Sequence, residues 1–412
     1  MKRADGLRRV VVTGFGMVTP IGLDSNETWA SMKQGKCGIG RIENFPLEDL
    51  YIHIAGEIKG FDPLKHVTSK RVQYGERYSW FAGRAAEEAW TMSGLPTPYN
   101  NPYRSCCIIG TGAGGYSTVE TAYRDLFINN KRATHPLTLL RIIGSSASAH
   151  VGIEYGIKGP TFATCSACST ATHAIGIAYD YIRQGLVDVG VAGASEAVLT
   201  YGSMRTWQAM RVLSPDGCFP FSKRRNGTVL AEGSGILVLE EYEHAKRRGA
   251  TILAELMGFG MSSDSKDMVN PDIDGPRSAM QFALDDAGLD PSEIDYLNAH
   301  GTATALNDVN ETNAIKDVFG EHAYKMAISS TKSMHGHLLG AGGGVEAGVC
   351  IKAINDGWVP PTIGYTEGDP KCDLDYVPNE GRSMKVRYTM SNSFAFGGLN
   401  AVLVFGPKPE GS

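Results

Sequence analysis

Residues 12–17 read VTGFGM, and residues 255–261 read ELMGFGM. Both stretches continue an apolar run of strand length, and both place glycine where another part of the backbone can approach closely. A strand-like segment of this kind therefore occurs twice, once near the start of the chain and once after its middle. The repetition predicts a duplicated architecture in which two similar halves meet near residue 250.

Apolar runs of strand length alternate with helical patterns in both halves. The first half has expected strands at residues 9–13, 107–110, 187–192 and 235–239 and expected helices at residues 78–93, 169–184 and 241–248. The second half has expected strands at residues 251–259, 294–298, 327–330 and 401–405 and expected helices at residues 275–287, 309–319 and 344–355. This alternation predicts an α/β protein with largely covered sheets, in which one half spans residues 1–250 and the other residues 251–412.

The composition is that of an ordinary globular protein. The 412 residues are 42% hydrophobic and 20% charged, and their net charge of −5 gives no sign of a nucleic-acid-binding protein. No apolar run approaches the ~20 residues of a membrane helix, and glycines interrupt the apolar stretch near the N-terminus before it can act as a signal segment. The eight cysteines lack the regular spacing of a disulfide framework. We therefore expect a cytoplasmic protein with no membrane insertion and no nucleic-acid partner.

A candidate nucleophile lies in residues 164–176, which read TCSACSTATHAIG. Cys168 stands where a helix is expected to begin. Free backbone N–H groups at that position favour a thiolate, can lower the thiol pKa from about 8.5 into the range of about 3.5–7.5, and can hold an oxyanion. A free cysteine can also be a small core residue, which is the interpretation we favour for Cys165. His173 lies inside the helical pattern, where we expect a packed or surface side chain.

Two histidines later in the chain complete a pattern typical of acyl transfer. His300 follows the strand expected to end at residue 298, and ligand sites of open α/β sheets lie at the carboxyl ends of strands. His337 lies in HGHLLG, residues 335–340. His335 and His337 could instead bind a metal, but no carboxylate or cysteine cluster stands near them at metal spacing, so we expect no metal site.

Two pairs of charged residues near these histidines have different explanations. Lys332 and Glu346 suggest an ion pair that could orient a histidine. Asp308 and Glu311 begin the expected helix at residues 309–319, where capping and the helix dipole explain acidic residues without a catalytic role.

Residues 392–400 read NSFAFGGLN, which places two phenylalanines beside a Gly-Gly pair. Phe394, Ala395 and Phe396 either pack as ordinary core residues or gate an apolar pocket at the mouth of the site. Gly397 and Gly398 supply the flexibility that such a gate requires.

Together these motifs resemble the β-ketoacyl-acyl carrier protein synthases, the condensing enzymes of fatty-acid synthesis, and the elongating synthase II type in particular. The match is collinear over nearly the whole chain, from VVTG at residues 11–14 to NAVLVF at residues 400–405. The resemblance implies a thiolase-like fold with two duplicated halves and a five-layered αβαβα core, and a homodimer. It also implies an acyltransferase that needs no cofactor of its own, because the phosphopantetheine arm arrives on the acyl carrier protein.

The resemblance assigns catalytic roles to five residues. Cys168 matches the nucleophile that carries the acyl group as a thioester, and His300 and His337 match the pair that promotes decarboxylation of the malonyl unit. Lys332 matches the lysine that supports this histidine region, and Glu346 matches its buried acidic partner. These roles imply a decarboxylative Claisen condensation with malonyl-acyl carrier protein, in which one covalent intermediate couples two steps.

The resemblance also assigns substrate-binding roles. Phe396 matches a gating phenylalanine, and its N–H group would form the oxyanion hole together with that of the nucleophile. Phe394 and Ala395 belong to the same gating segment. Thr302 and Thr304 match the hydroxyl groups that contact the phosphopantetheine arm.

The chain departs from the common pattern of the family at several positions. Ala395 replaces a glycine before the gating phenylalanine, Leu399 replaces a threonine, His335 stands where a threonine is usual, and Ala305 stands where a proline is common. Ala113 replaces a larger isoleucine at the acyl pocket. Because alanine leaves more room, we expect a long, branched or otherwise specialised acyl chain. The departures are similar to those of specialised branches, including nodulation-signal and long-chain lipid synthases.

An acidic carrier protein would require a basic rim around the site. Five residues are candidates for that rim, although each is individually more often a solvated surface charge: Lys70, Arg71, Lys131, Arg132 and Arg205.

Two other functions compete with this interpretation. A thiolase would need a second catalytic cysteine near the C-terminus, and the chain has no cysteine after Cys372. A chain-length-determining subunit of a heterodimer, with little activity alone, would usually lack the nucleophile, whereas Cys168 is present.

Overall fold

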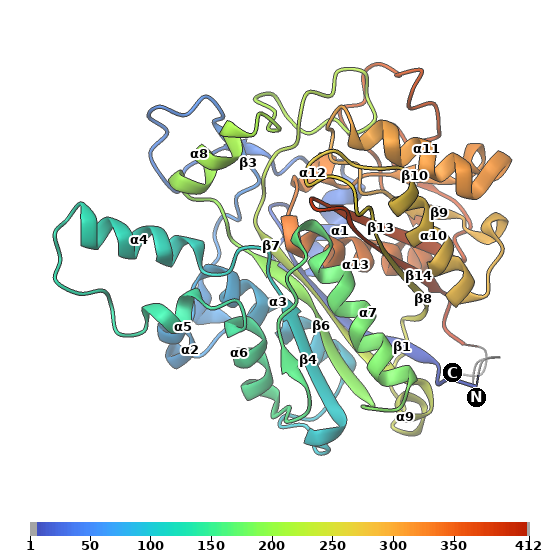
Figure 1. Cartoon of the computed structure of the whole chain (residues 1–412). Helices are drawn as coiled ribbons and strands as arrows, with labels where there is room; N and C mark the ends of the chain where they lie inside the picture. The colour runs from blue at the N-terminus through green and yellow to red at the C-terminus, as the bar shows by residue number, and fades with distance from the viewer. Residues whose placement is uncertain (1–5, 410–412) are drawn as a thin grey trace.

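A computed structural model describes residues 6–409 of the chain. Its main sheet has ten strands, in the order β10-β9-β13-β14-β8-β1-β7-β6-β4-β5 (Figure 1). The strands of the first half are β1 (Val10–Val18), β4 (Ser105–Gly110), β5 (Thr161–Phe162), β6 (Val189–Glu196) and β7 (Gly233–Glu241). Those of the second half are β8 (Ala254–Ser263), β9 (Tyr296–Asn298), β10 (Ala327–Ser329), β13 (Thr389–Ala395) and β14 (Leu399–Gly406).

The two sets of strands repeat one topology. In the first set, β1 pairs antiparallel with β7, β7 pairs antiparallel with β6, β6 pairs parallel with β4, and β4 pairs parallel with β5. In the second set, β8, β14, β13, β9 and β10 repeat these pairings in the same order. The sets join where β1 pairs with β8 over residues 10–12 and 254–256. The structure thus confirms the duplicated architecture, while the division of the chain at residue 250 stays a prediction.

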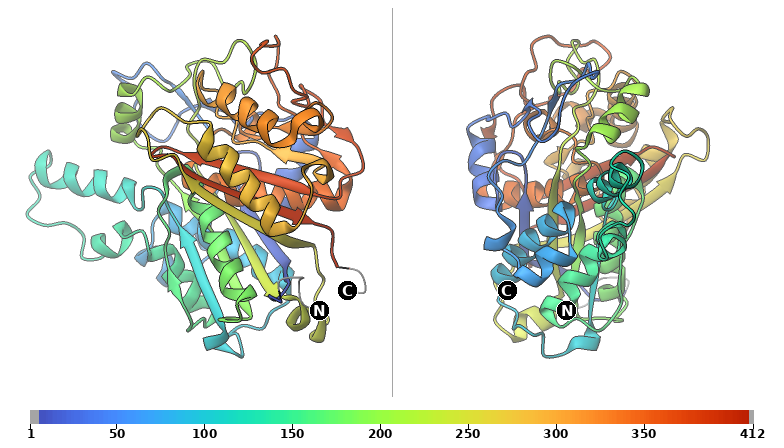
Figure 2. Two further views of the ribbon diagram at one scale, coloured as in Figure 1. Left: turned by 45° about the vertical axis from the view of Figure 1, so that its right-hand side comes forward. Right: turned by 90° about the vertical axis from the view of Figure 1, so that its left-hand side faces the viewer.

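Helices lie on both outer faces of the sheet and between its two sets of strands (Figure 2). Helices α3 (Arg77–Ser93) and α6 (Ser146–Tyr155) cover the first set, and α10 (Asp274–Ala287), packed beside α11 (Asn307–Phe319), covers the second. Helices α7 (Thr170–Arg183) and α13 (Gly342–Asp356) pack against each other and contact strands of both sets. This is the five-layered αβαβα core of a thiolase-like fold.

The remaining elements connect or flank these layers. The helices are α1 (Ser25–Lys33), α2 (Ser69–Tyr74), α4 (Tyr116–Phe127), α5 (Thr138–Ile142), α8 (Tyr201–Ala209), α9 (Tyr242–Arg247) and α12 (Lys332–His335), and the short strands are β2 (Gly40–Arg41), β3 (Ile54–Ala55), β11 (Trp358–Val359) and β12 (Arg382–Ser383). Helices α4 and α5 project from the body of the molecule, on the left of Figure 1. Within residues 6–409, no helix has both the length and the apolar character needed to cross a membrane.

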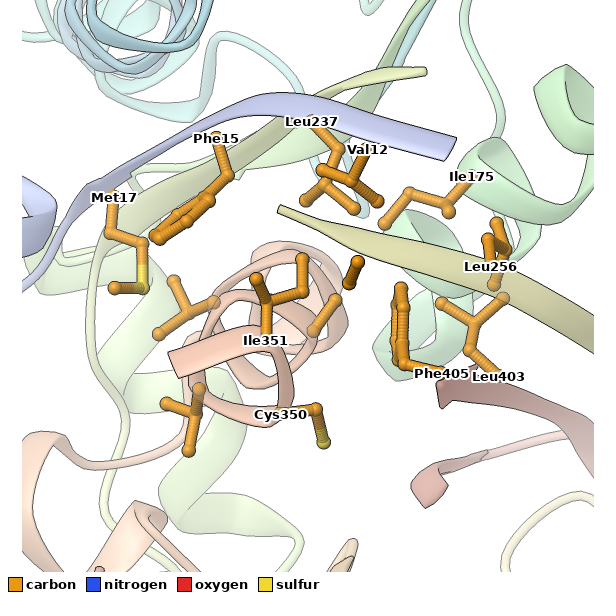
Figure 3. Packing of buried hydrophobic residues seen from close by; sticks show 14 of the residues in the cluster. Val12, Phe15, Met17, Ile175, Leu237, Leu256, Cys350, Ile351, Leu403 and Phe405 are labelled. Atoms are coloured by element: carbon orange, nitrogen blue, oxygen red, sulfur yellow. The ribbon is translucent and has the colours of Figure 1, made fainter. Parts of the chain in front are cut away.

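Helix α13 forms the centre of the largest core cluster. Figure 3 shows its residues Cys350 and Ile351 surrounded by apolar side chains from both sets of strands, among them Val12, Phe15, Leu237, Leu256, Leu403 and Phe405. The helix begins with three glycines, and the third of them lies very close to the neighbouring backbone. A Cβ atom on Gly344 would lie 2.2 Å from the carbonyl oxygen of Gly235. Close packing of this kind fixes the layer that carries both middle helices.

The two middle helices begin in the same way. A 3₁₀ turn, η3 (Ala167–Ser169), precedes α7, and a second turn, η6 (Leu339–Ala341), precedes α13. Ala167 has φ 47° and Leu339 has φ 48°, which are unusual values for residues other than glycine. The turns η3 and η6 contact each other. Equivalent sharp turns of the two halves therefore meet at one place.

Residues 392–400 lie in a hairpin. Residues 392–395 belong to strand β13, and only residues 396–398 form the turn before β14. Strand β13 was not among the expected strands, and it is rich in polar residues. Thr389, Ser391, Asn392 and Ser393 are nevertheless fully buried in this strand.

Candidate active site

Cys168 lies in the turn η3, immediately before α7, where its side chain reaches a cavity. Hydrogen bonds within the turn define its shape: Ser166 N–H donates to Thr170 Oγ1 at 2.9 Å, and Thr170 Oγ1 donates to the carbonyl oxygen of Ala167 at 2.7 Å. The turn holds Ala167 at its positive φ, so strain is stored next to the thiol. Cys168 is 8% exposed, and the expected position at the start of a helix is confirmed.

His337 is the side chain that contacts this thiol. Its Nε2 atom lies 3.1 Å from Cys168 Sγ. The backbone of His337 is fixed on both sides, because its N–H donates to the carbonyl oxygen of Val229 at 2.7 Å and its carbonyl oxygen accepts from Ala231 N–H at 2.9 Å. A segment of the first half therefore positions a histidine of the second half against the candidate nucleophile.

His300 faces the same cavity from the loop that follows β9. Its ring centroid lies 5.5 Å from that of His337, with the ring planes 83° apart, and 5.9 Å from that of Phe394. His300 is 3% exposed. The structure thus brings Cys168, His300 and His337 together, although they lie far apart in the sequence.

Two buried acids hold the loop that carries His300. Glu311 accepts the backbone N–H groups of His300 and Gly301 at 2.8 and 2.7 Å, and Asp308 accepts that of Ala303 at 3.1 Å. Burial raises the pKa of Glu311 to about 7 and that of Asp308 to about 6. The interpretation of both acids as ordinary helix-capping residues was wrong, because their oxygens bind the preceding loop.

Lys332 and Glu346 form the expected ion pair, and each side chain is 1% exposed. Burial, followed by the positive charge of Lys332, lowers the pKa of His300 and of His337 well below the ordinary value. Both imidazoles are therefore neutral near pH 7, and each carries one N–H donor. Each ring can therefore donate one hydrogen bond to a negative oxygen.

The pKa of the Cys168 thiol is raised, whereas the start of a helix was expected to lower it. Burial, assisted by the negative charges of Glu196 and Glu346, raises its pKa to about 12, although Lys332 and a backbone N–H group oppose that shift. The expected depression of the pKa was wrong because the loss of hydration outweighs the helix terminus. The free protein therefore holds Cys168 as a neutral thiol at neutral pH.

The cavity has a volume of about 350 Å³. Besides the nucleophile and the two histidines, five predicted residues line it: Thr302, Thr304, Phe394, Ala395 and Phe396. The hydroxyl groups of Thr302 and Thr304 lie 3.0 Å apart. Sequence reasoning missed Trp207, Arg211 and Met268, which also line the cavity, because each lies in a segment with no motif.

The hairpin turn at residues 396–398 is closed against the loop that follows β8. Gly397 N–H donates to the carbonyl oxygen of Met268 at 2.9 Å, and Asp264 N–H donates to that of Gly398 at 2.9 Å. The Trp207 and Phe396 rings lie 6.1 Å apart. Ala395 ends strand β13 outside the residues with positive φ, so its replacement of glycine does not strain this arrangement.

Ala113 lies outside the cavity lining. It is exposed in the loop after β4, where its N–H group donates to Glu196 Oε1 at 3.2 Å. Glu196 is fully buried and also accepts from the N–H groups of Gly112 and Gly340, at 2.8 and 3.2 Å. One carboxyl group therefore ties the loop of Ala113 to the turn before α13.

The two other residues near the nucleophile have different outcomes. Cys165 is exposed, with its Sγ atom 3.7 Å from the carbonyl oxygen of Gly112, so its interpretation as a core residue was wrong. His173 packs beside the ring of Phe259, with a centroid distance of 6.3 Å, and its Nδ1 atom lies 2.8 Å from Ser166 Oγ. The expectation of a packed side chain is confirmed for His173.

The five residues proposed for the basic rim lie on three separate segments. These residues are Lys70 and Arg71 in α2, Lys131 and Arg132 between α4 and α5, and Arg205 in α8. Arg71 forms an ion pair with Glu154, and Lys131 forms one with Asp125 at 2.9 Å. These two positive charges are therefore already partly neutralised within the chain.

Comparison with known proteins places this geometry in a family. Residues 7–245 match the model described as Beta-ketoacyl synthase, N-terminal domain, and residues 253–366 match Beta-ketoacyl synthase, C-terminal domain. Nodulation protein E of Rhizobium sp. (strain N33) is 46% identical over 398 residues, which cover 97% of this chain and 99% of that protein. The 3-oxoacyl-[acyl-carrier-protein] synthase 2 of Staphylococcus aureus (strain COL) is 42% identical over 405 residues, which cover 97% and 98%.

A solved structure agrees with these matches. The ishigamide ketosynthase/chain length factor has a TM-score of 0.94 and 34% sequence identity, over 98% of this chain and all of that one. Both family models, the two relatives and the solved structure indicate the same family. The chain belongs to the β-ketoacyl synthase family of acyl-transferring condensing enzymes.

Proposed function

We propose that the chain joins an acyl group, held as a thioester on Cys168, to the carbanion formed from malonyl-acyl carrier protein. The observation that carries this assignment is the 3.1 Å contact between His337 Nε2 and Cys168 Sγ in a cavity that His300 also faces. The products are carbon dioxide and a β-ketoacyl-acyl carrier protein. Thioesters supply all the chemistry of this reaction, so the chain needs no cofactor of its own.

The first half-reaction loads the acyl group. Cys168 Sγ attacks the thioester carbonyl of the acyl donor, the C–S bond to the carrier breaks, and the departing thiolate takes the proton that the thiol loses. His337 Nε2 is placed to hold that proton in transit. The N–H groups of Cys168 and Phe396 are the donors proposed for the oxyanion that forms during the attack.

The second half-reaction forms the new carbon–carbon bond. Loss of carbon dioxide from the malonyl group leaves an enolate, whose oxygen accepts N–H donors from the neutral imidazoles of His300 and His337. Its carbon attacks the acyl thioester on Cys168, the C–S bond breaks, and the thiolate takes up one proton from the solvent, which is the proton that loss of the malonyl carboxylate consumes overall. The ion pair of Lys332 with Glu346 keeps a buried positive charge beside these steps.

The carrier protein would deliver its substrates through the cavity mouth. Thr302 and Thr304 line the cavity with adjacent hydroxyl groups, which suits the amides of a phosphopantetheine arm. A relative is named for an acyl-carrier-protein substrate, which supports the same partner. The basic residues proposed for the docking rim remain part of this proposal, with Arg211 added because it is exposed and lines the cavity.

We also propose a homodimer. Helices α4 and α5 project from the body and expose large apolar side chains, with Tyr123 59% exposed, Phe127 77% and Leu139 69%. Exposed apolar groups that cluster on one projection are typical of a protein interface.

The eight cysteines are all free, which supports a reducing compartment such as the cytoplasm.

The decisive experiment is an assay of the isolated chain. Purified protein with malonyl-acyl carrier protein and an acyl donor should release carbon dioxide and form the β-ketoacyl product, and the Cys168→Ala variant should form none of the product. Light scattering should give twice the mass of one chain. If the pure chain condenses no acyl donor but does so when a second ketosynthase-like chain is added, the proposal is wrong and a chain-length-determining role in a heterodimer is supported; the ishigamide structure is the comparison that motivates this control.

A further inference from the structure

His335 is a buried histidine that the proposed chemistry does not use. It ends helix α12, two residues before His337, and is 0% exposed. Its Nδ1 atom lies 2.7 Å from the carbonyl oxygen of Gly336, and its Nε2 atom lies 3.1 Å from Thr331 Oγ1. Both ring nitrogens therefore have partners within the same short segment.

These contacts define the protonation state of the ring. A carbonyl oxygen can only accept, so Nδ1 of His335 carries the hydrogen and donates it to Gly336. Nε2 must then accept the hydroxyl hydrogen of Thr331. Burial and the nearby charge of Lys332 lower the pKa of His335 to about 3, which agrees with a neutral ring.

The hydrogen bond to Gly336 acts on the peptide group that leads into His337. The carbonyl oxygen of Gly336 and the N–H group of His337 belong to one planar unit. His335 Nδ1 holds the oxygen edge of that plane at 2.7 Å, and the carbonyl oxygen of Val229 holds its N–H edge at 2.7 Å. The plane cannot rotate without breaking one of these two bonds.

The conformation of Gly336 depends on this double restraint. Gly336 has φ 79° and ψ −175°, and a Cβ atom at this position would lie 3.0 Å from Ala231 Cβ. Glycine reaches this geometry without steric cost but also leaves it easily. The direction of the next side chain, His337, therefore relies on what holds the peptide.

We infer that His335 is a positioning residue, whose imidazole holds the peptide between Gly336 and His337 so that His337 Nε2 stays in contact with Cys168 Sγ. The inference deepens the proposed function and rests on it for the catalytic consequence. The imidazole spans from Thr331 Oγ1 to the carbonyl oxygen of Gly336, so it restrains the turn from two sides.

Two substitutions distinguish the hydrogen bond from His335 to Gly336 from simple filling of space by the ring. His335→Asn keeps an N–H donor at the distance of Nδ1 from the backbone, whereas His335→Phe keeps a ring but no donor. Ser333→Ala is the matched control, because Ser333 is buried in the same helix but bonds to Ser330 and Ile363. For each variant, malonyl decarboxylation is measured per active site, with active sites counted by the mass shift on alkylating Cys168.

A positioning role for His335 predicts a specific order of activities among these variants. His335→Phe should lower kcat for decarboxylation about tenfold to a hundredfold with little change in KM, because a small displacement of a catalytic group has an effect of this size. His335→Asn should stay within about threefold of wild type, as should Ser333→Ala. Equal losses in the Asn and Phe variants, or a Phe variant with wild-type kcat, would overturn the inference.

A crystal structure of His335→Phe tests the geometry without reference to turnover. The separation of His337 Nε2 from Cys168 Sγ should increase from 3.1 Å to beyond the reach of a hydrogen bond that involves sulfur. An unchanged contact contradicts the inference even if activity is lost. If His335→Phe does not fold, Thr331→Val replaces it, because it removes the other anchor of the ring and should lower kcat in the same direction. A wild-type chain that does not decarboxylate malonyl thioesters would count against the proposed function instead, and the crystallographic result would still decide the role of His335.

Discussion

His337 Nε2 lies 3.1 Å from Cys168 Sγ, although 169 positions separate the two residues in the chain. One residue belongs to the turn before α7 and the other to the segment before α13. The contact therefore exists only when the two sets of strands are packed around the middle helices. Any substitution that loosens this packing should reduce catalysis before it unfolds the protein.

The reactivity of Cys168 should depend on pH in a way that its burial dictates. With a thiol pKa of about 12, alkylation by iodoacetamide should be slow at pH 7 and rise about tenfold per pH unit up to pH 9.5, without a plateau. Mass spectrometry of the peptide that contains Cys168 follows the reaction, with Cys168→Ser as background. A plateau below pH 8 would show instead that the helix terminus controls this thiol.

Removal of Lys332 should be far more damaging than removal of the whole ion pair. Lys332→Met leaves the carboxylate of Glu346 buried without its partner, at a cost of about 3–5 kcal/mol in the free energy of unfolding. The double variant Lys332→Met, Glu346→Leu should regain a large part of that loss but not the decarboxylation activity. Urea unfolding curves measure the difference, and simple additivity of the two single variants would contradict this account.

Glu311→Ala should damage catalysis through the His300 loop. The substitution leaves two buried N–H groups without their acceptor, each at a cost of about 1–3 kcal/mol, and frees the backbone of His300. We expect kcat for decarboxylation to fall at least about tenfold with a lowered melting temperature. Asp317→Ala, on the exposed face of the same helix, is the control that should change neither. An active Glu311→Ala variant would mean that the loop is held in place by its other contacts.

The neutral ring of His335 should make the protein sensitive to acid. Its pKa is about 3 in the folded chain and about 6.5 when unfolded, so between these values the unfolded state binds one more proton. Stability from this group is therefore lost as the pH falls below about 6.5, by about 1.4 kcal/mol per pH unit once well below that value. His335→Asn cannot titrate, so its stability relative to wild type should improve by that slope between pH 6 and pH 4.5. The free energy of unfolding in urea is measured for both proteins at each pH. If it changes with pH to the same extent in both, His335 is protonated in the folded chain as readily as in the unfolded one.

Ala113→Ile should shorten the preferred acyl chain, because the larger side chain leaves less room for that chain. The side chain lies in the loop that Glu196 ties to the turn before α13, close to the nucleophile turn. Turnover is compared for donors of increasing length with wild type and variant. An unchanged preference would mean that Ala113 does not border the bound chain.

Sequence patterns predicted the parts of this molecule that depend on local chemistry. The repeated strand segment at residues 12–17 and 255–261 indicated the duplication, and the small residues around Cys168 indicated a helix start. The polar strand β13 was missed because its residues are buried only when the layers assemble. The direction of the Cys168 pKa was missed for the same reason, since the motif shows the helix terminus but not the depth of burial.

The matching turns at Ala167 and Leu339 have a consequence for how such a site can arise. A chain made of two identical halves would offer the same strained corner twice, with the same chemical group at each. In this chain the two corners differ, because the first carries the thiol of Cys168 whereas the segment beside the second carries the imidazole of His337. The site therefore depends on a chemical difference between two halves that share one topology, since a nucleophile and a proton carrier must meet there.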